Sequence, residues 1–258
     1  MRQISRPRGW GMRTEVAILH ALSYLVLITI GITMLVPFLW MISTSLKNLA
    51  ETQIYPPRWI PRPPLWSNYR EVMVQVPFAK FIYNSFKVSI LGVIGQVLTC
   101  STAAYALARL RMPGSSTILM MILATQMFPG IVIAIPLFLV MSRLHLVDTH
   151  FALVVVYLSF TLPIVIWILK GFFESVPMEL ERAAAVDGAS PLQTFRHVVL
   201  PISLPPLFAT GVFVFIESWN EFFFAIILTR INVKTAPIAI AEFSGQYQTL
   251  YGQMLASA

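Results

Sequence analysis

Residues 152–169 read ALVVVYLSFTLPIVIWIL, without a single Asp, Glu, Lys or Arg. With residues 149–151 the uncharged stretch reaches about 20 residues, which is the length that a helix needs to cross the hydrocarbon core of a bilayer. Because backbone in lipid must satisfy its own hydrogen bonds, such a stretch forms either a helix or a strand of a closed barrel. Barrel strands have about 10 residues and alternate apolar with polar side chains. This stretch does neither, so it indicates a transmembrane helix.

Four further stretches, 16–46, 88–108, 112–142 and 197–216, are equally free of charge. We therefore predict an all-α polytopic membrane helix bundle, a single transmembrane domain over residues 1–258. Its five spans are expected near residues 18–44, 84–108, 116–142, 151–173 and 205–229. The step Phe128-Pro129-Gly130, close before Pro136, predicts that the third span is the most bent, because proline removes a helical hydrogen bond.

Composition agrees with a membrane location. Of the 258 residues, 57% are hydrophobic and only 11% charged, against roughly 25% in soluble domains. A soluble enzyme, a disordered chain and a disulfide scaffold are excluded, and Cys100, the one cysteine, has no partner for an internal disulfide. The net charge of +7 could suggest nucleic acid. The basic residues are spread over the flanks of the spans, however, which favours membrane lipid headgroups and no nucleic acid.

Orientation rests on the placement of Lys and Arg. The first 13 residues hold Arg2, Arg6, Arg8 and Arg13, and a tight turn holds Arg109 and Arg111, which favours a cytoplasmic N-terminus. The total number of Lys and Arg is the same on both sides and decides nothing. With this orientation residues 45–82 form the longest outer segment. Its five prolines, Pro56, Pro57, Pro61, Pro63 and Pro64, forbid a continuous helix, so we expect an ordered loop at the membrane face.

Residues 174–203 are too polar to span the membrane and too patterned for a simple linker. Pro177 is suited to open a short helix, and Gly188 to close it in the left-handed conformation. Ser190, followed by Pro191 and Gln193, predicts a second helix that begins with a capping box. We expect Leu200-Pro201 to end that helix. The segment is thus predicted to be a helical hairpin exposed on one membrane face.

This loop resembles the EAA loop of ATP-binding-cassette importer permeases. The resemblance is carried by ERAAAVDGA at 181–189, Phe195 and VVLP at 198–201, with Gly188 six residues after Arg182. Elsewhere the sequence is similar to the carbohydrate branch, in the maltose-type second permease subunit. The matching stretches span nearly the whole chain: Asn68-Tyr69, Asn84-Ser85, AAYALARLRMPG at 103–114 and WNEF at 219–222.

The resemblance implies a multi-pass subunit of a bacterial or archaeal plasma membrane that imports a sugar or polyol. It implies as partners two cytoplasmic ATPase subunits carrying ATP and Mg²⁺, a second permease subunit and an external solute-binding protein. The chain itself would bind no cofactor and catalyse no reaction. The residues that would couple it to the ATPases are Glu179, Glu181, Arg182, Ala183, Ala184, Asp187 and Gly188. In the family a Glu opens the motif where Arg182 stands here, so we expect Glu181 to make a substitute contact.

Acidic side chains inside the fifth predicted span are candidates for lining a transport pathway. Glu217 and Glu221 are four residues apart and would share one helix face, beside Trp219 and Asn220. Carboxylates at membrane depth are costly and tend to face a cavity or a partner. Acids, amides and indoles suit sugars, which carry hydroxyls and stack on aromatic rings. The alternative is that both acids contact the sister subunit or lie near the outer interface.

Several signals are missing from the sequence. No G-x-x-x-x-G-K-[ST] phosphate loop, no nucleophile–base set and no cluster with metal-ligand spacing is present. An ion-coupled secondary transporter remains the main alternative, since Glu217 and Glu221 could serve ion coupling. Five spans with an inside N-terminus would leave Ala258 outside, so we expect a sixth helix that this sequence does not contain.

Overall fold

The computed structural model describes residues 10–110, 113–245 and 249–258, with side chains from residue 16 onward. Arg2, Arg6, Arg8 and Arg111 lie outside the described residues, as does the side chain of Arg13. Helices make up most of the described part of the chain, which contains no strand beyond one isolated bridge between Ser244 and Thr249. The all-α prediction is confirmed. Contacts divide the chain into two compact units, Met1–Val72 with Phe243–Ala258, and Met73–Glu242.

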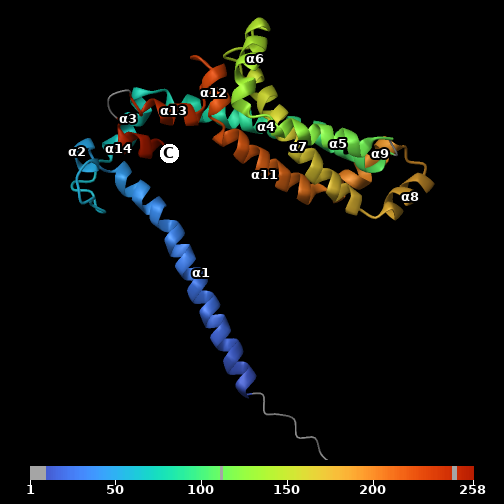
Figure 1. The fold of residues 1–258 in the computed structure, drawn as a ribbon, viewed down its shortest axis with the longest axis horizontal. Helices are drawn as coiled ribbons and strands as arrows, with labels where there is room; N and C mark the ends of the chain where they lie inside the picture. The colour runs from blue at the N-terminus through green and yellow to red at the C-terminus, as the bar shows by residue number, and fades with distance from the viewer. Residues whose placement is uncertain (1–9, 111–112, 246–248) are drawn as a thin grey trace, which may run out of the picture. The chain divides into compact units, whose positions relative to one another are not determined.

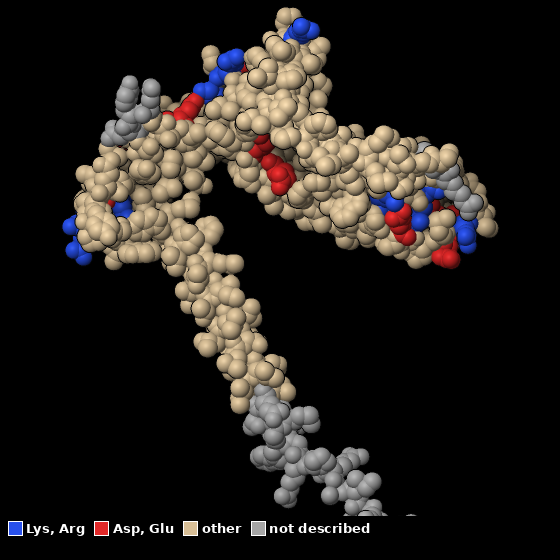
Figure 2. Space-filling model, viewed as in Figure 1, with Lys and Arg blue, Asp and Glu red and all other residues tan. Residues whose placement is uncertain are grey.

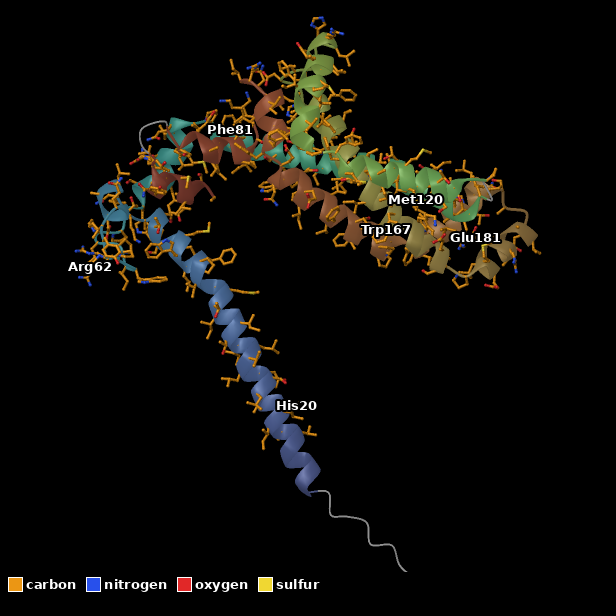
Figure 3. All side chains as sticks on the ribbon, viewed as in Figure 1. His20, Arg62, Phe81, Met120, Trp167 and Glu181 are labelled. Atoms are coloured by element: carbon orange, nitrogen blue, oxygen red, sulfur yellow. The ribbon has the colours of Figure 1, made fainter. Side chains whose placement is uncertain are left out.

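The first unit contains the long helix α1, Trp10–Ser45, which confirms the first predicted span. Figure 1 shows α1 as one continuous helix, and in Figure 2 its described surface carries no charged side chain. None of its most apolar window is buried within the chain. His20 is exposed on it (Figure 3), so among the described residues no neighbour packs closely around that imidazole.

Side chains hold together the end of this unit that follows α1. Helices α2 (Leu49–Thr52) and α14 (Tyr251–Ser257) belong to it, and α3 (Ser67–Gln75) begins in it. The buried amide of Asn68 donates to the carbonyls of Ser45 (2.7 Å) and Lys47 (3.0 Å). The Lys47 ammonium lies 3.9 Å from the ring centroid of Trp40. No helix forms from Gln53 to Trp66, where the five prolines lie.

Three long helices form the body of the second unit: α4 (Phe78–Arg109), α7 (His150–Ser175) and α11 (Leu204–Asn220). They run side by side (Figure 1), and one apolar cluster between them includes Cys100, Leu169 and Val214. The second and fourth predicted spans are thereby confirmed. Short helices complete the unit, among them α12 (Phe223–Leu228) and α13 (Ala236–Glu242).

Two spans of this unit are bent. Helix α5 (Ser115–Ala124) continues as the 3₁₀ turn Thr125–Met127 and then meets α6 (Gly130–Arg143) at 96°. The bend lies at Phe128-Pro129, as predicted, because Pro129 lacks the amide that would continue the helix. A second bend of 76° separates residues 191–202 from α11. Three helices are long and apolar enough to cross a membrane, or five spans if each bent pair counts as one.

Two boundary predictions were wrong. Leu200-Pro201 does not end the second helix of the 174–203 loop: α9 (Pro191–Thr194), the π-helical turn Phe195–Val199 and α10 (Leu200–Ile202) follow without a break, and the chain turns at Ser203. Pro201 lies next to the end of this helical run, so its missing N–H affects only the last turn. The fifth span is not one helix over 205–229 either, because α11 ends at Asn220 and α12 begins at Phe223.

Candidate functional site

The 174–203 loop has the predicted hairpin geometry. Helix α8, Met178–Val186, begins after Pro177. Gly188 follows it with φ +83°, a conformation that glycine adopts without strain. Its N–H bonds to the carbonyl of Ala185 (3.1 Å), and the next N–H, that of Ala189, bonds to the carbonyl of Ala184 (2.9 Å). These two bonds form a Schellman motif, which satisfies carbonyls at the end of the helix.

The second helix of the loop begins with the predicted capping box. The backbone N–H of Ser190 donates to the side-chain oxygen of Gln193 (2.7 Å), and the N–H of Gln193 donates to the Ser190 hydroxyl (3.4 Å). The Schellman motif at the end of α8 and the capping box at the start of α9 thus fix the turn between the two helices. Acidic and basic side chains gather at the end of the second unit that carries α8 and α9 (Figure 2).

One face of α8 is open and mostly small or apolar. Val186 is 87% exposed, and Leu192 just beyond the turn is 73% exposed. Of the residues predicted for coupling, Glu181 and Ala184 are partly buried, and the others are exposed: Glu179, Arg182, Ala183, Asp187 and Gly188. An exposed helix with alanines between two charged positions is a suitable surface for another protein to contact.

Glu181, labelled in Figure 3, ties the covered face of α8 to α4. Its carboxylate accepts from Nε of Arg109 at 2.5 Å and from the hydroxyl of Tyr105 at 2.9 Å. A guanidinium nitrogen of Arg109 also donates to the carbonyl of Val176 at 2.6 Å. Glu181 is thus bonded within this chain, to α4, whereas Arg182 is exposed. Whether Glu181 also makes the substitute contact expected in the loop stays a prediction.

A second candidate site lies where α11 ends. Glu221 has extended backbone (φ −69°, ψ 120°), and its carboxylate accepts from the N–H groups of Phe224 (2.8 Å) and Ala225 (3.0 Å). It thus caps the first turn of α12. The expectation that Glu217 and Glu221 share one helix face was wrong, since the helix stops between them.

Glu217 and Glu221 nevertheless line one cavity of about 230 Å³, which we call the helix-break cavity. Its other walls come from α7, Ser218 and the first turn of α12: Tyr157, Phe160, Thr161, Ser218 and Phe224. The oxygens of the buried Tyr157 and Ser218 have no hydrogen-bond partner among the described residues. The cavity therefore offers hydroxyls and carboxylates beside aromatic rings.

The other two candidates lie apart from this cavity. Trp219 stacks on Phe215 with ring centroids 5.7 Å apart, and the Asn220 amide donates to the carbonyl of Ile216 at 2.9 Å. Sequence reasoning missed Tyr157 and Thr161, whose four-residue spacing puts two hydroxyls on one face of α7. That spacing was the available signal.

A third polar centre, also missed, is Asp148 before α7. Its carboxylate accepts from the backbone N–H groups of residues 230–233 and from the Asn232 amide (2.8 Å). Partial burial raises the pKa of Asp148, but these N–H donors outweigh that effect and lower its pKa overall. The Asn84 amide holds the same segment through the carbonyls of Asn232 (3.2 Å) and Lys234 (2.9 Å). No group of three or more His, Cys, Asp or Glu in the described ranges could hold a metal ion.

Comparison with known proteins gives the family. Residues 96–258 match the model of the "Binding-protein-dependent transport system inner membrane component", which is more than half of the chain. The chain belongs to this family. It is therefore the transmembrane subunit, or permease, of a binding-protein-dependent importer, and the alternative of a secondary transporter is set aside.

Known relatives are similar to this chain over most of their own length. The permease is 36% identical over 227 residues to the trehalose transport system permease protein of Mycobacterium tuberculosis, covering 87% of this chain and 82% of that one. It is 33% identical over 240 residues to the trehalose/maltose transport system permease protein of Thermococcus litoralis, covering 90% and 84%. A probable ABC transporter permease of Sinorhizobium fredii is 38% identical over 224 residues, covering 87% and 80%.

A solved structure shows the same fold. The match is a chain of a bacterial ABC transporter involved in the import of the acidic polysaccharide alginate, with a TM-score of 0.74 and 23% identity. It covers all of this permease and 92% of that chain. The all-helical membrane bundle of the permease is thus a known importer architecture.

Proposed function

We propose that this permease moves a sugar or related polyol inward across a bacterial or archaeal plasma membrane by alternating access. Two cytoplasmic ATPase subunits drive it, and they, with bound ATP and Mg²⁺, perform the chemistry. A second permease subunit completes the pathway, and an external solute-binding protein delivers the solute. The chain catalyses no reaction, binds no cofactor and contacts membrane lipid but no nucleic acid.

The observation that carries this proposal is the exposed face of α8. A helix of nine residues between two sharp caps presents alanines and charged side chains outward, while its other face is tied to the long helix α4. When the ATPases close on ATP, a contact on this face would move α8 and thereby tilt the bundle. Contact with the ATPases would put the 174–203 loop in the cytoplasm, and because four spans precede this loop, the N-terminus would lie on the same side.

The substrate class is supported by two features. Relatives of the permease are named for trehalose and for trehalose or maltose. The helix-break cavity combines the carboxylates of Glu217 and Glu221 with hydroxyls and the rings of Phe160 and Phe224, which stack at 4.6 Å. These are groups that bind sugar hydroxyls and pack on sugar rings. Glu217 and Glu221 in this cavity, and Trp219 and Asn220 outside it, remain our candidates for lining the transport pathway.

Reconstitution tests the proposal. The permease, co-expressed with its second permease and ATPase subunits, is placed in proteoliposomes with the binding protein, and uptake of a panel of mono- and oligosaccharides and polyols is measured. We expect uptake to require ATP and the binding protein. Uptake by the permease without any ATPase would contradict the proposal.

A variant pair tests the role of α8. Ala183→Trp puts a bulky side chain on the exposed face of α8 without disturbing its covered side, and we expect it to abolish co-purification of the ATPases. Ser142→Trp, exposed at the end of α6, is the matched control and should keep the ATPases bound. Full ATPase retention by Ala183→Trp would show that the contact lies elsewhere.

A further inference from the structure

One ion pair joins the 174–203 loop to the end of α4. Arg109 stands in the last turn of α4, and Glu181 in the first turns of α8, 72 residues later. Their side chains are only 9% and 13% exposed. The pair Lys170–Glu174, by contrast, lies within α7, and its Glu174 side chain is 50% exposed. Only the first pair links two elements and is shielded from water, so its attraction is weakened less by solvent.

The geometry of the pair restricts α8 in more than one direction. Arg109 donates from Nε to Glu181 and from a second nitrogen to the carbonyl of Val176, which precedes α8. Tyr105, one turn earlier on the same face of α4, donates to the other oxygen of Glu181. Three hydrogen bonds therefore fix both the start of α8 and its first turns.

The ring of Tyr105 also contacts the end of α7 and the second helix of the loop. It lies 4.7 Å from the ring centroid of Phe195 in the π-helical turn and 6.0 Å from that of Phe173 near the end of α7. Phe173 is fully buried and Phe195 is 7% exposed. The last turns of α4 thus provide one platform for the whole loop.

We infer that Arg109 and Tyr105 are positioning residues that clamp the 174–203 loop to α4, so that a displacement of α8 reaches the helix bundle without loss. This inference rests on the proposed function. A nine-residue helix has little stability of its own and holds its place through tertiary contacts. With the clamp intact, α8 and α4 move as one body. Without it, Pro177 and Gly188, the residues on either side of α8, act as hinges that absorb the motion.

The test is the number of solute molecules imported per ATP hydrolysed, measured on the reconstituted complex and normalised to assembled transporter. We expect Arg109→Gln to lower this ratio about tenfold, within the usual range for coupling between sites. Arg109→Lys keeps the charge but cannot reach Glu181 and the Val176 carbonyl together, so its ratio should lie between those of the wild type and Arg109→Gln. Glu174→Gln, which breaks the pair within α7, is the control and should leave the ratio unchanged.

Tyr105→Phe allows the inference to be tested even if the arginine variants do not assemble into a complex. It removes one hydrogen bond and keeps the ring contacts with Phe173 and Phe195, so the ratio should fall about threefold. A loss of folding would reduce the amount of complex but not the ratio. An unchanged ratio in Arg109→Gln overturns the inference. If Arg109→Gln does not assemble, an unchanged ratio in both Tyr105→Phe and Arg109→Lys overturns it.

Hydrogen exchange separates this inference from the proposed function. In the purified permease complex, Arg109→Gln should speed amide exchange across Met178–Val186 at least tenfold over wild type, whether or not the complex transports sugar, because the clamp is a property of this chain. Wild-type exchange rates there would overturn the inference alone. A wild-type complex that imports nothing with ATP would refute the proposed function alone.

Discussion

Asp148 organises the segment that joins α12 to α13, and its removal should loosen that segment. Its carboxylate faces four backbone N–H groups, those of Arg230 (3.0 Å), Ile231 (3.3 Å), Asn232 (3.0 and 3.1 Å) and Val233 (3.2 Å). Hydrogen bonds to a charged group contribute about 1.5–3 kcal/mol each. Residues 230–232 are exposed, so water replaces part of what is lost. Counting the two shortest bonds and this replacement, we expect Asp148→Ala to lower the local opening free energy by about 3 kcal/mol.

Backbone conformation adds to this effect. Asp148 has φ +62°, which Asp and Asn tolerate better than Ala, for which the left-handed region costs about 1–2 kcal/mol. Asp148→Asn keeps that tolerance and one acceptor oxygen, so it should lose less than Asp148→Ala. His145→Asn is the control, because His145 has φ +55° in the same turn and its side chain makes no hydrogen bond within the described ranges.

The assay is amide hydrogen exchange over residues 229–235 in the purified complex. A loss of about 3 kcal/mol corresponds to roughly a hundredfold faster exchange. Because the pKa of Asp148 is lowered in the folded chain, its contribution is complete above the unfolded value near 3.9 and disappears as pH falls through the folded value. The wild-type segment should therefore stay protected at pH 5 and loosen only at lower pH. Equal exchange in Asp148→Ala and His145→Asn would refute this reasoning.

Two further predictions concern packing and capping. A Cβ at Gly252 would lie 2.6 Å from the Lys47 carbonyl oxygen and 2.7 Å from the Asn68 amide nitrogen, so Gly252→Ala should destabilise the first unit by about 1–3 kcal/mol. Gly31→Ala, with nothing within 4 Å of the added Cβ, is the matched control, and equal thermal melting of the two variants would contradict the packing. Glu221→Ala removes the cap of α12 and should cost about 1 kcal/mol, seen as faster exchange at Phe224 and Ala225. Glu217→Gln, which caps nothing, should leave that exchange unchanged, and the same result for Glu221→Ala would refute the capping role.

Local signals were sufficient wherever one residue type fixes the backbone. Pro129 produced the bend in the third span, Gly188 the left-handed cap and Ser190 the capping box, each at the predicted position. In each case the cause is steric or lies within four residues along the chain, so the sequence contains it. The uncharged stretches also predicted the long helices, because the thickness of the bilayer sets the length of a spanning helix.

The break at Glu221 gave no such signal. Residues 217–225 contain neither proline nor glycine. The helix stops where the Glu221 carboxylate accepts from the N–H groups of Phe224 and Ala225, which offers the backbone an alternative to the next helical turn. The pairs Arg109–Glu181 and Asp148–Asn232 were equally hidden, because their partners are 72 and 84 residues apart. Only the packing of α4, α7 and α11 brings them together, and one sequence does not reveal which helices are neighbours.

Helix α7 connects the two candidate sites. Phe173, against Tyr105, stands near the end of α7 that leads to the loop, and Tyr157, in the helix-break cavity, lies sixteen residues earlier, about 24 Å away along the axis. Between them Thr161 donates to the side-chain oxygen of Gln96 on α4 at 3.2 Å. The contacts at Phe173 and Thr161 thus join α7 to α4 at two points along its length. If solute binds in the helix-break cavity, as we propose, a displacement at the 174–203 loop should change the walls that α7 shares with Glu217 and Glu221, and solute binding should in turn alter the exposure of α8.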